Sequence, residues 1–243
     1  MPLSCCALFY LKTLCISFHL IRKGYMKRRI QDLIKESRYI KEENLGNKNK
    51  YFEFFEGYDG VILNNNIPYF QDNEITNVCS EKYFNLDNLG RCGQVTACTG
   101  RERLITKKRT YIGHIIPSGW HSVKYDCIKG KYLFNRCHIL GHQLAGQDIK
   151  NNLITGTRYL NVSQMLPFEN AIADYCKTTS KHVMYRVRPI YKYDDLVAHG
   201  ILLQALSVED GGGGVCFNIY LYNRQPGIDI NYETGESNVT EKV

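Results

Sequence analysis

The feature that most limits the fold of this chain is one helical pattern set among strand-like segments. After residue 100, apolar residues recur clearly at helical spacing in one stretch, and Pro167 is tolerable in its first turn. The residues with this spacing are Phe168, Ile172, Ala173 and Cys176. The surrounding segments alternate or form short apolar runs, as strands do. The centre therefore reads as strand, loop and helix, and the predicted fold class is α+β with a mixed, mainly antiparallel sheet.

The predicted strands are short and are separated by turn signals, which is typical of antiparallel hairpins. The Asn64–Asn66 turn follows the first of them, and Lys129 and Gly130 separate two others. Four glycines at 211–214 supply a flexible turn between the last two. The predicted strands are residues 60–63, 120–125, 132–134, 183–187, 197–206 and 215–222.

The 243 residues, 44% of them hydrophobic, are enough to bury one sizeable core. We expect this folded domain to occupy residues 51–236. Residues 1–50 precede it as an apolar segment and a basic linker, in which Ile30, Leu33 and Ile34 have helical spacing. The acidic end from Tyr232 is expected to fray, with 237–243 as the tail.

The N-terminal segment leaves the compartment open between two alternatives. Residues 5–20 are apolar enough for a signal peptide or weak anchor, which indicates a secreted or cell-surface protein, but Lys12 and His19 interrupt them. Met26, followed by three basic residues, would instead be a natural start for a cytoplasmic protein. No stable membrane span is expected in either case.

Charge and cysteine content restrict the partners only loosely. The 31 Lys and Arg against 24 Asp and Glu give a net charge of +7, which favours polyanionic partners but also occurs in proteins without them. Ten cysteines contain no C-x-x-C pair, which removes the commonest zinc and redox signatures. Cys92 and Cys98 are close enough in sequence to bridge, but we expect buried free thiols.

Residues 134–138 lead out of a predicted strand, and two of their side chains could take part in catalysis. Because side chains alternate along a strand, Arg136 and His138 should project to the same side. Cutting a phosphodiester needs a general base, a cation at the phosphate and donors that hold the backbone. A neutral imidazole suits the first task, and the arginine fork suits the third.

Oxygen ligands for a hard cation follow further along the chain. Asn161 and Glu169 could supply an amide oxygen and a carboxylate to Mg²⁺, which usually keeps several waters. Eight residues of continuous helix separate two groups by about 12 Å along the axis, so we expect a water-mediated role for Glu169. Pro167 lies between them and could kink or restart the helix, which leaves their true separation open.

These segments resemble a known family. Residues 135–141, Asn-Arg-Cys-His-Ile-Leu-Gly, are similar to the Asp-Arg-Gly-His motif of the DNA/RNA non-specific endonucleases, the ββα-metal or His-Me finger nucleases. Residues 152–161 and 165–170 resemble the branch that contains secreted bacterial DNases and DNA-entry nucleases. The similarity extends from about Leu63 to about Gly235, through further blocks at 89–93, 117–121 and 222–227. It implies a ββα-metal finger core, two antiparallel strands and a helix around one divalent metal.

The resemblance also implies roles for individual residues. His138 matches the general base, Arg136 the motif arginine, Asn152 a supporting active-site asparagine, Asn161 the metal-binding asparagine and Glu169 the helix carboxylate. Our own candidate for a further phosphate contact is Arg158. Two positions depart from the motif: Asn135 replaces its aspartate and keeps a carbonyl oxygen, and Cys137 replaces its glycine with a bulkier, oxidisable side chain.

The function predicted from these residues is a metal-dependent, sequence-nonspecific endonuclease that hydrolyses DNA, with RNA left open, using Mg²⁺ or Mn²⁺. A non-catalytic nucleic-acid-binding or DNA-uptake protein is the alternative from another class. An inhibitor or immunity partner is neither supported nor excluded. Two weaker alternatives are a zinc site built from Cys127, Cys137, His138 and His142, and an enzyme with Cys137 as nucleophile.

Overall fold

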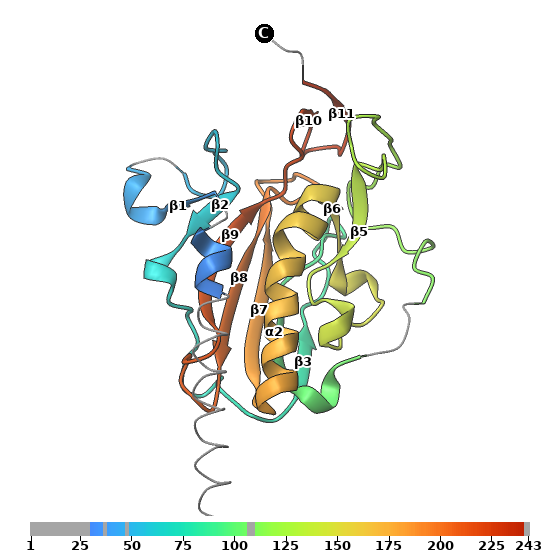
Figure 1. Cartoon of the computed structure of the whole chain (residues 1–243). Coiled ribbons are helices and arrows are strands. Elements are labelled where there is room, and N and C mark those ends of the chain that lie inside the picture. The colour runs from blue at the N-terminus through green and yellow to red at the C-terminus, as the bar shows by residue number, and fades with distance from the viewer. Residues whose placement is uncertain (1–29, 36–37, 47–48, 106–109, 241–243) are drawn as a thin grey trace, which may run out of the picture.

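The computed structural model describes residues 30–35, 38–46, 49–105 and 110–240 of the chain. In this described part, seven strands form a sheet in the order β1-β2-β9-β8-β7-β4-β3 (Figure 1). The β1–β2 pair is parallel and the other neighbours are antiparallel. The strands are β1 (Tyr39–Lys41), β2 (Gly60–Ile62), β3 (Ser80–Tyr83), β4 (Val95–Thr99), β7 (Val183–Ile190), β8 (Gly200–Ser207) and β9 (Cys216–Tyr222).

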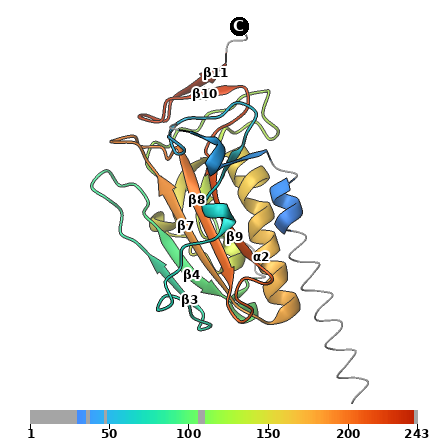
Figure 2. The ribbon, with the colours of Figure 1, turned by 90° about the vertical axis from the view of Figure 1, so that its left-hand side faces the viewer.

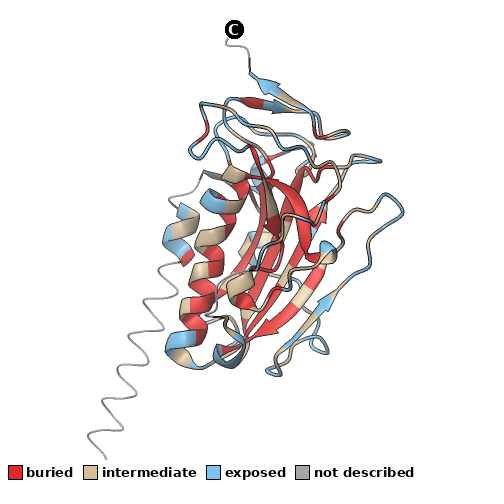
Figure 3. Cartoon of the chain, turned by 90° about the vertical axis from the view of Figure 1, so that its right-hand side faces the viewer, coloured by how far each residue is buried: buried red, intermediate tan, exposed pale blue. Residues whose placement is uncertain are grey.

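The main core lies between this sheet and the helix α2 (Leu166–Thr179). Phe168 and Ile172 are buried on α2, and the Phe168 ring lies 5.0 Å from that of Phe217 on β9. The helix ends at Ser180, whose left-handed backbone turns its N–H onto the Cys176 carbonyl. Residues 30–35 form a shorter helix beside α2 (Figure 2), with Ile30 in the same core. Buried residues follow the strands and α2, whereas exposed residues gather on the outer loops (Figure 3).

A separate hairpin stands beside the sheet and leads into α2. Its strands are β5 (Phe134–His138) and β6 (Leu153–Thr157), which pair antiparallel with His138 opposite Leu153. The connection contains the short helices η4 (His142–Leu144) and η5 (Lys150–Asn152). After β6 the chain enters the π-helix η6 (Tyr159–Met165), which continues directly into α2. The predicted α+β class, with a mainly antiparallel sheet and a ββα core, is confirmed.

Two local predictions were wrong. Residues 120–125 are not a regular strand: they make one bridge, Lys124 to Tyr132, beside a turn in which Gly130 and Lys131 have positive φ. The C-terminal end does not fray from Tyr232. Tyr232 stacks on His199 at 4.2 Å between ring centroids.

One strand lies before the expected domain limits of residues 51–236, and another lies after them. β1 belongs to the sheet although it precedes residue 51. Beyond residue 236, β11 (Ser237–Val239) pairs with β10 (Ile228–Ile230). These three-residue strands join the fold through backbone pairing rather than through an apolar pattern of their own.

Two cysteines that are close enough in sequence to bridge are not bonded to each other in the structure. Cys92 and Cys98 are both buried free thiols, as expected. Across the ranges that the structure describes, no helix combines the length and apolarity needed to cross a membrane. The predicted apolar segment at 5–20 and the alternative start at Met26 lie outside those ranges.

Candidate active site

His138 ends β5, and its surroundings fix the direction of its ring. The residue is only 4% exposed, and its Nε2 lies 2.8 Å from Oδ1 of Asp148. The Thr110 hydroxyl donates to the other carboxylate oxygen. Burial raises the pKa of Asp148, but the hydrogen bonds from Thr110 and His138 outweigh it and lower the pKa overall. Asp148 is therefore ionised at neutral pH and can accept a hydrogen bond from a protonated Nε2 of His138.

Asn152 fixes the path of the chain just beyond His138. It is fully buried, and its Oδ1 accepts the Leu140 N–H at 2.9 Å. Its Nδ2 donates to the carbonyls of Leu140 and Gln147 at 3.0 and 2.9 Å. One side chain thus satisfies three backbone groups on either side of η4. It holds the loop that carries Asp148.

Asn161 contacts the β5 strand at Cys137. It lies in the π-helix η6, and its Oδ1 is 3.3 Å from the Cys137 sulfur. The same sulfur lies 3.4 Å from Sδ of Met165. Because neighbouring residues on a strand alternate, Cys137 faces the helix while His138 turns toward Asp148. The thiol that replaces the motif glycine therefore contacts the candidate metal ligand.

Glu169 lies in the first turn of α2 and is 5% exposed. Its carboxylate packs directly on Gly141: a Cβ at that position would lie 2.5 Å from Oε2. Glycine is thus required there by space rather than by φ, which is −58°. The helical run from Asn161 to Glu169 changes from π to α at Leu166, so Pro167 falls in a first turn where its missing N–H does little harm.

The two arginines predicted to bind phosphate contact other parts of the protein in this structure. Arg136 donates from Nε to the Ile115 carbonyl at 2.6 Å and from Nη2 to the Gly113 carbonyl at 2.7 Å. Its guanidinium also stacks on Trp120 at 4.2 Å. Arg158 packs against Gly130, at the end of the hairpin away from His138.

Sequence reasoning missed Asp148 and Thr110. The carboxylate follows His138 by ten residues in an irregular loop, and no spacing rule pairs them. His142 is also near, with Nδ1 4.0 Å from Asp148 Oδ1. The zinc alternative is not assembled, because Cys137 faces the helix and Cys127 is exposed on a turn near the far end of the hairpin.

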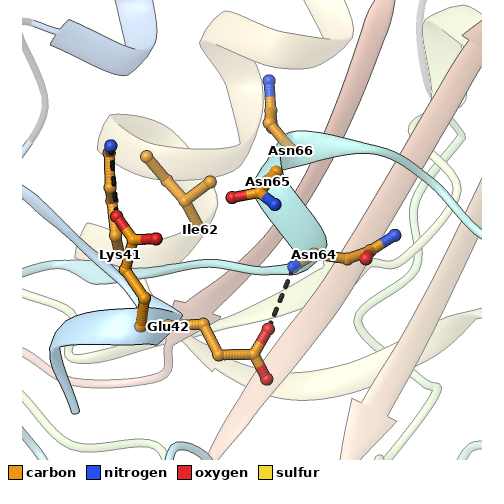
Figure 4. Close-up of a pocket in the computed structure, with 7 residues that line it drawn as sticks. Lys41, Glu42, Ile62, Asn64, Asn65 and Asn66 are labelled. Carbon is orange, nitrogen blue, oxygen red and sulfur yellow. Dashed lines mark hydrogen bonds and ion pairs between the residues drawn. The ribbon is translucent and has the colours of Figure 1, made fainter.

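A pocket of about 510 Å³ lies away from all these residues (Figure 4). It is bordered by β1, η1 (Glu42–Asn44), β2 and η2 (Asn64–Asn66). Its charged side chains already have partners: Lys41 pairs with Glu43, and Glu42 accepts the Asn64 N–H and the Lys50 ammonium. None of the predicted site residues lines it.

A hairpin that ends in a buried histidine, followed by a helical run carrying an asparagine and a glutamate, is a ββα unit. The chain belongs to the DNA/RNA non-specific endonuclease family, whose sequence profile matches residues 72–208. A deoxyribonuclease from Streptococcus dysgalactiae subsp. equisimilis is 32% identical over 127 residues. That match covers 47% of this chain and 38% of the relative, so the chain spans little more than a third of that protein's length.

Solved structures share the fold. NucA from Streptococcus agalactiae without metal is 22% identical, with a TM-score of 0.66, over 87% of this chain and 96% of NucA. Its magnesium-bound form has a TM-score of 0.64 at the same identity, over 87% of this chain and 95% of that one. The zinc-bound Sda1 nuclease is 23% identical, with a TM-score of 0.57, over 67% of this chain and 81% of Sda1.

Proposed function

We propose that this chain is a metal-dependent, sequence-nonspecific endonuclease that hydrolyses phosphodiester bonds in DNA. The observation that carries the proposal is the pairing of buried His138 with Asp148 in a ββα unit. Family membership supports it independently. RNA remains a second substrate class to be tested, because contacts to a phosphate backbone carry little base information.

His138 is the proposed general base. Ionised Asp148 orients the ring through Nε2, and the imidazole takes a proton from water. Asp148 is then a positioning residue that fixes the tautomer and stabilises the imidazolium as it forms. Asn152 acts one step further away, since its three hydrogen bonds hold the loop on which Asp148 lies.

Asn161 is the proposed metal ligand, and the donors around it fit a hard divalent cation. Its amide oxygen and the Glu169 carboxylate are the ligand types that Mg²⁺ and Mn²⁺ prefer. When bound, such an ion would neutralise charge on the phosphate and the leaving oxygen. Glu169, eight residues along the helical run, would act through water. The Cys137 thiol, 3.3 Å from Asn161 Oδ1, competes for the same oxygen.

The arginines take different roles in this proposal. Arg136, with two donors committed to backbone carbonyls, anchors residues 113–115 to the hairpin. Any phosphate contact uses its remaining donors. Arg158 lies five residues beyond Leu153, the partner of His138, which is about 16 Å along the paired strands at about 3.3 Å per residue. It would therefore contact a different phosphate from the one that is cleaved.

A plasmid assay on the full chain tests the proposal against the non-catalytic binding protein. Supercoiled DNA is incubated with Mg²⁺, with Mn²⁺, with EDTA and with a folded His138→Ala variant. Both classes bind DNA in a salt-sensitive way, but only the enzyme nicks it. Cleavage that disappears with EDTA and with His138→Ala supports the enzyme. Intact plasmid with every metal would leave the binding protein as the better proposal.

A further inference from the structure

A second cluster of metal-binding side chains lies outside the hairpin site. Among the described residues, one group of histidine, cysteine and carboxylate side chains brings its donor atoms within 4.8 Å of one another: Cys79, Glu102 and His182. The Cys79 sulfur lies 2.9 Å from Glu102 Oε1, and His182 Nε2 lies 3.0 Å from the same oxygen. The three residues come from segments far apart in sequence.

The topology of the sheet explains why they meet. Cys79 immediately precedes β3, Glu102 lies in η3 (Arg101–Arg103) just after β4, and His182 immediately precedes β7. Because β4 pairs antiparallel with both β3 and β7, the last residues of β4 lie beside the first residues of β3 and β7, at the same end of these strands. The cluster is therefore built on paired strands rather than on a free loop.

Glu209 orients the histidine from behind. His182 Nδ1 lies 2.5 Å from Glu209 Oε1, and the His182 backbone N–H donates to Glu209 Oε2 at 2.9 Å. In this double contact the Nδ1–H of His182 donates to Glu209, and Nε2 is turned toward Cys79 and Glu102. A carboxylate behind a histidine ring is the usual second contact of a metal-bound imidazole.

Gly100 keeps the space beside the cluster clear. A Cβ at this position would lie 2.5 Å from Cδ2 of His182 and 2.8 Å from both His182 Nε2 and Glu102 Oε2. The φ of Gly100 is −138°, an ordinary extended conformation, so its backbone alone would accept another residue. Space for the imidazole and the carboxylate is thus the specific requirement for glycine.

We propose that Cys79, Glu102 and His182 bind one Zn²⁺ ion, with Glu209 supporting the histidine and water as the fourth ligand. Sulfur, nitrogen and carboxylate oxygen are the ligands zinc takes in proteins, at about 2.3, 2.0 and 2.0 Å. Tetrahedral edges built from those bonds are about 3.5 Å for sulfur to oxygen and about 3.3 Å for nitrogen to oxygen. The ligands would spread by about half an ångström from their present separations. Zinc replaces the thiol proton and the proton between His182 and Glu102.

The proposed ion would fasten the edge strand β3 to β7 across β4. It has no part in the proposed cleavage chemistry, because its ligands flank β3, β4 and β7, whereas His138 lies on β5 and Asn161 in η6. The plain alternative is a hydrogen-bonded network with a protonated His182 between Glu102 and Glu209. The number of zinc ions bound per chain distinguishes the zinc site from the hydrogen-bonded network.

Zinc content is measured on the full chain after loading with Zn²⁺ and exhaustive dialysis, by inductively coupled plasma mass spectrometry. We expect one zinc per chain in the wild type, in Asn161→Ala and in the control Cys127→Ser, which changes an exposed thiol. We expect none in Cys79→Ser, Glu102→Gln or His182→Gln. Glu209→Gln should bind zinc about 10–100-fold more weakly. Zinc that is absent from the wild type, or that is lost with Asn161→Ala and kept by Cys79→Ser, would overturn the proposal.

Cobalt substitution and thermal melts distinguish loss of the metal site from misfolding of a variant. Co²⁺ in the wild type should give a thiolate charge-transfer band that Cys79→Ser lacks while its far-ultraviolet circular dichroism is unchanged. A zinc-selective chelator should lower the melting temperature of the wild type but not that of Cys79→Ser. A wild-type cobalt spectrum without a sulfur band would contradict the site even if zinc were bound.

Discussion

Gly141→Ala should displace the Glu169 carboxylate and little else. The added methyl carbon would lie 2.5–2.6 Å from both carboxylate oxygens and Cδ of Glu169, whereas ordinary contact begins near 3.4 Å. The carboxylate must therefore retreat by about 0.9 Å. Overpacking of this kind costs about 1–3 kcal/mol of stability. A misplacement of about 1 Å near reacting groups costs about 100-fold in rate, so we expect a folded enzyme with about 1% of wild-type cleavage.

Initial rates of plasmid nicking at saturating Mg²⁺, together with thermal melts, measure both effects. The matched background is Glu169→Ala, in which the new methyl group has no carboxylate to displace. Gly141→Ala should then cause no further loss of rate, so the two changes should be strongly non-additive. A Gly141→Ala enzyme within twofold of wild type, or an equal loss in both backgrounds, would refute the proposed role of Glu169.

Three further predictions concern the same site. Asp148→Asn should lower the cleavage rate about 10²–10⁴-fold with His138 still in place. Because the folded pKa of Asp148 is lowered, its stabilising effect is present at neutral pH and is lost as pH falls through that pKa; urea melts should show this acid loss in wild type but not in Asp148→Asn. Cys137→Gly should free Asn161 Oδ1 and lower the Mg²⁺ concentration for half-maximal rate about 2–10-fold, at some cost in melting temperature; no change in metal titrations would count against that contact. Asn152→Ala should destabilise the fold by about 3 kcal/mol, seen as a melting temperature about 6–12 °C lower; a smaller shift than about 2 °C would contradict the clamp.

The ββα unit could be predicted from sequence because its signals are local. The spacing of Phe168 and Ile172 marks the helix, and the resemblance around His138 marks the strand that ends beside it. Alternation also placed Cys137 and His138 on opposite faces, as observed. These features depend on periodicity within a few residues, which a single sequence carries.

The surroundings of the site could not be predicted, because they depend on contacts between distant segments. The partners of Arg136 are an example, because the carbonyls that accept its hydrogen bonds come from residues 113–115, more than 20 positions earlier. Asp148 meets His138 only because Asn152 folds the intervening loop back. The short strands β1 and β11 have no apolar alternation, so their pairing partners decide their conformation.

The pairing of β2 with β9 has a consequence for how this chain assembles. Val61 lies opposite Tyr220, so β2, from the first third of the chain, can pair only after β9, a strand near the end of the chain, has been made. Contacts between such distant segments form slowly, because a long loop must close first. During synthesis, the β5–β6 hairpin and α2 can form from contiguous chain, whereas the edge of β9 that receives β2 becomes available only after residue 222 emerges. We therefore expect a chain shortened before β9 to hold a formed ββα unit over an open, association-prone sheet.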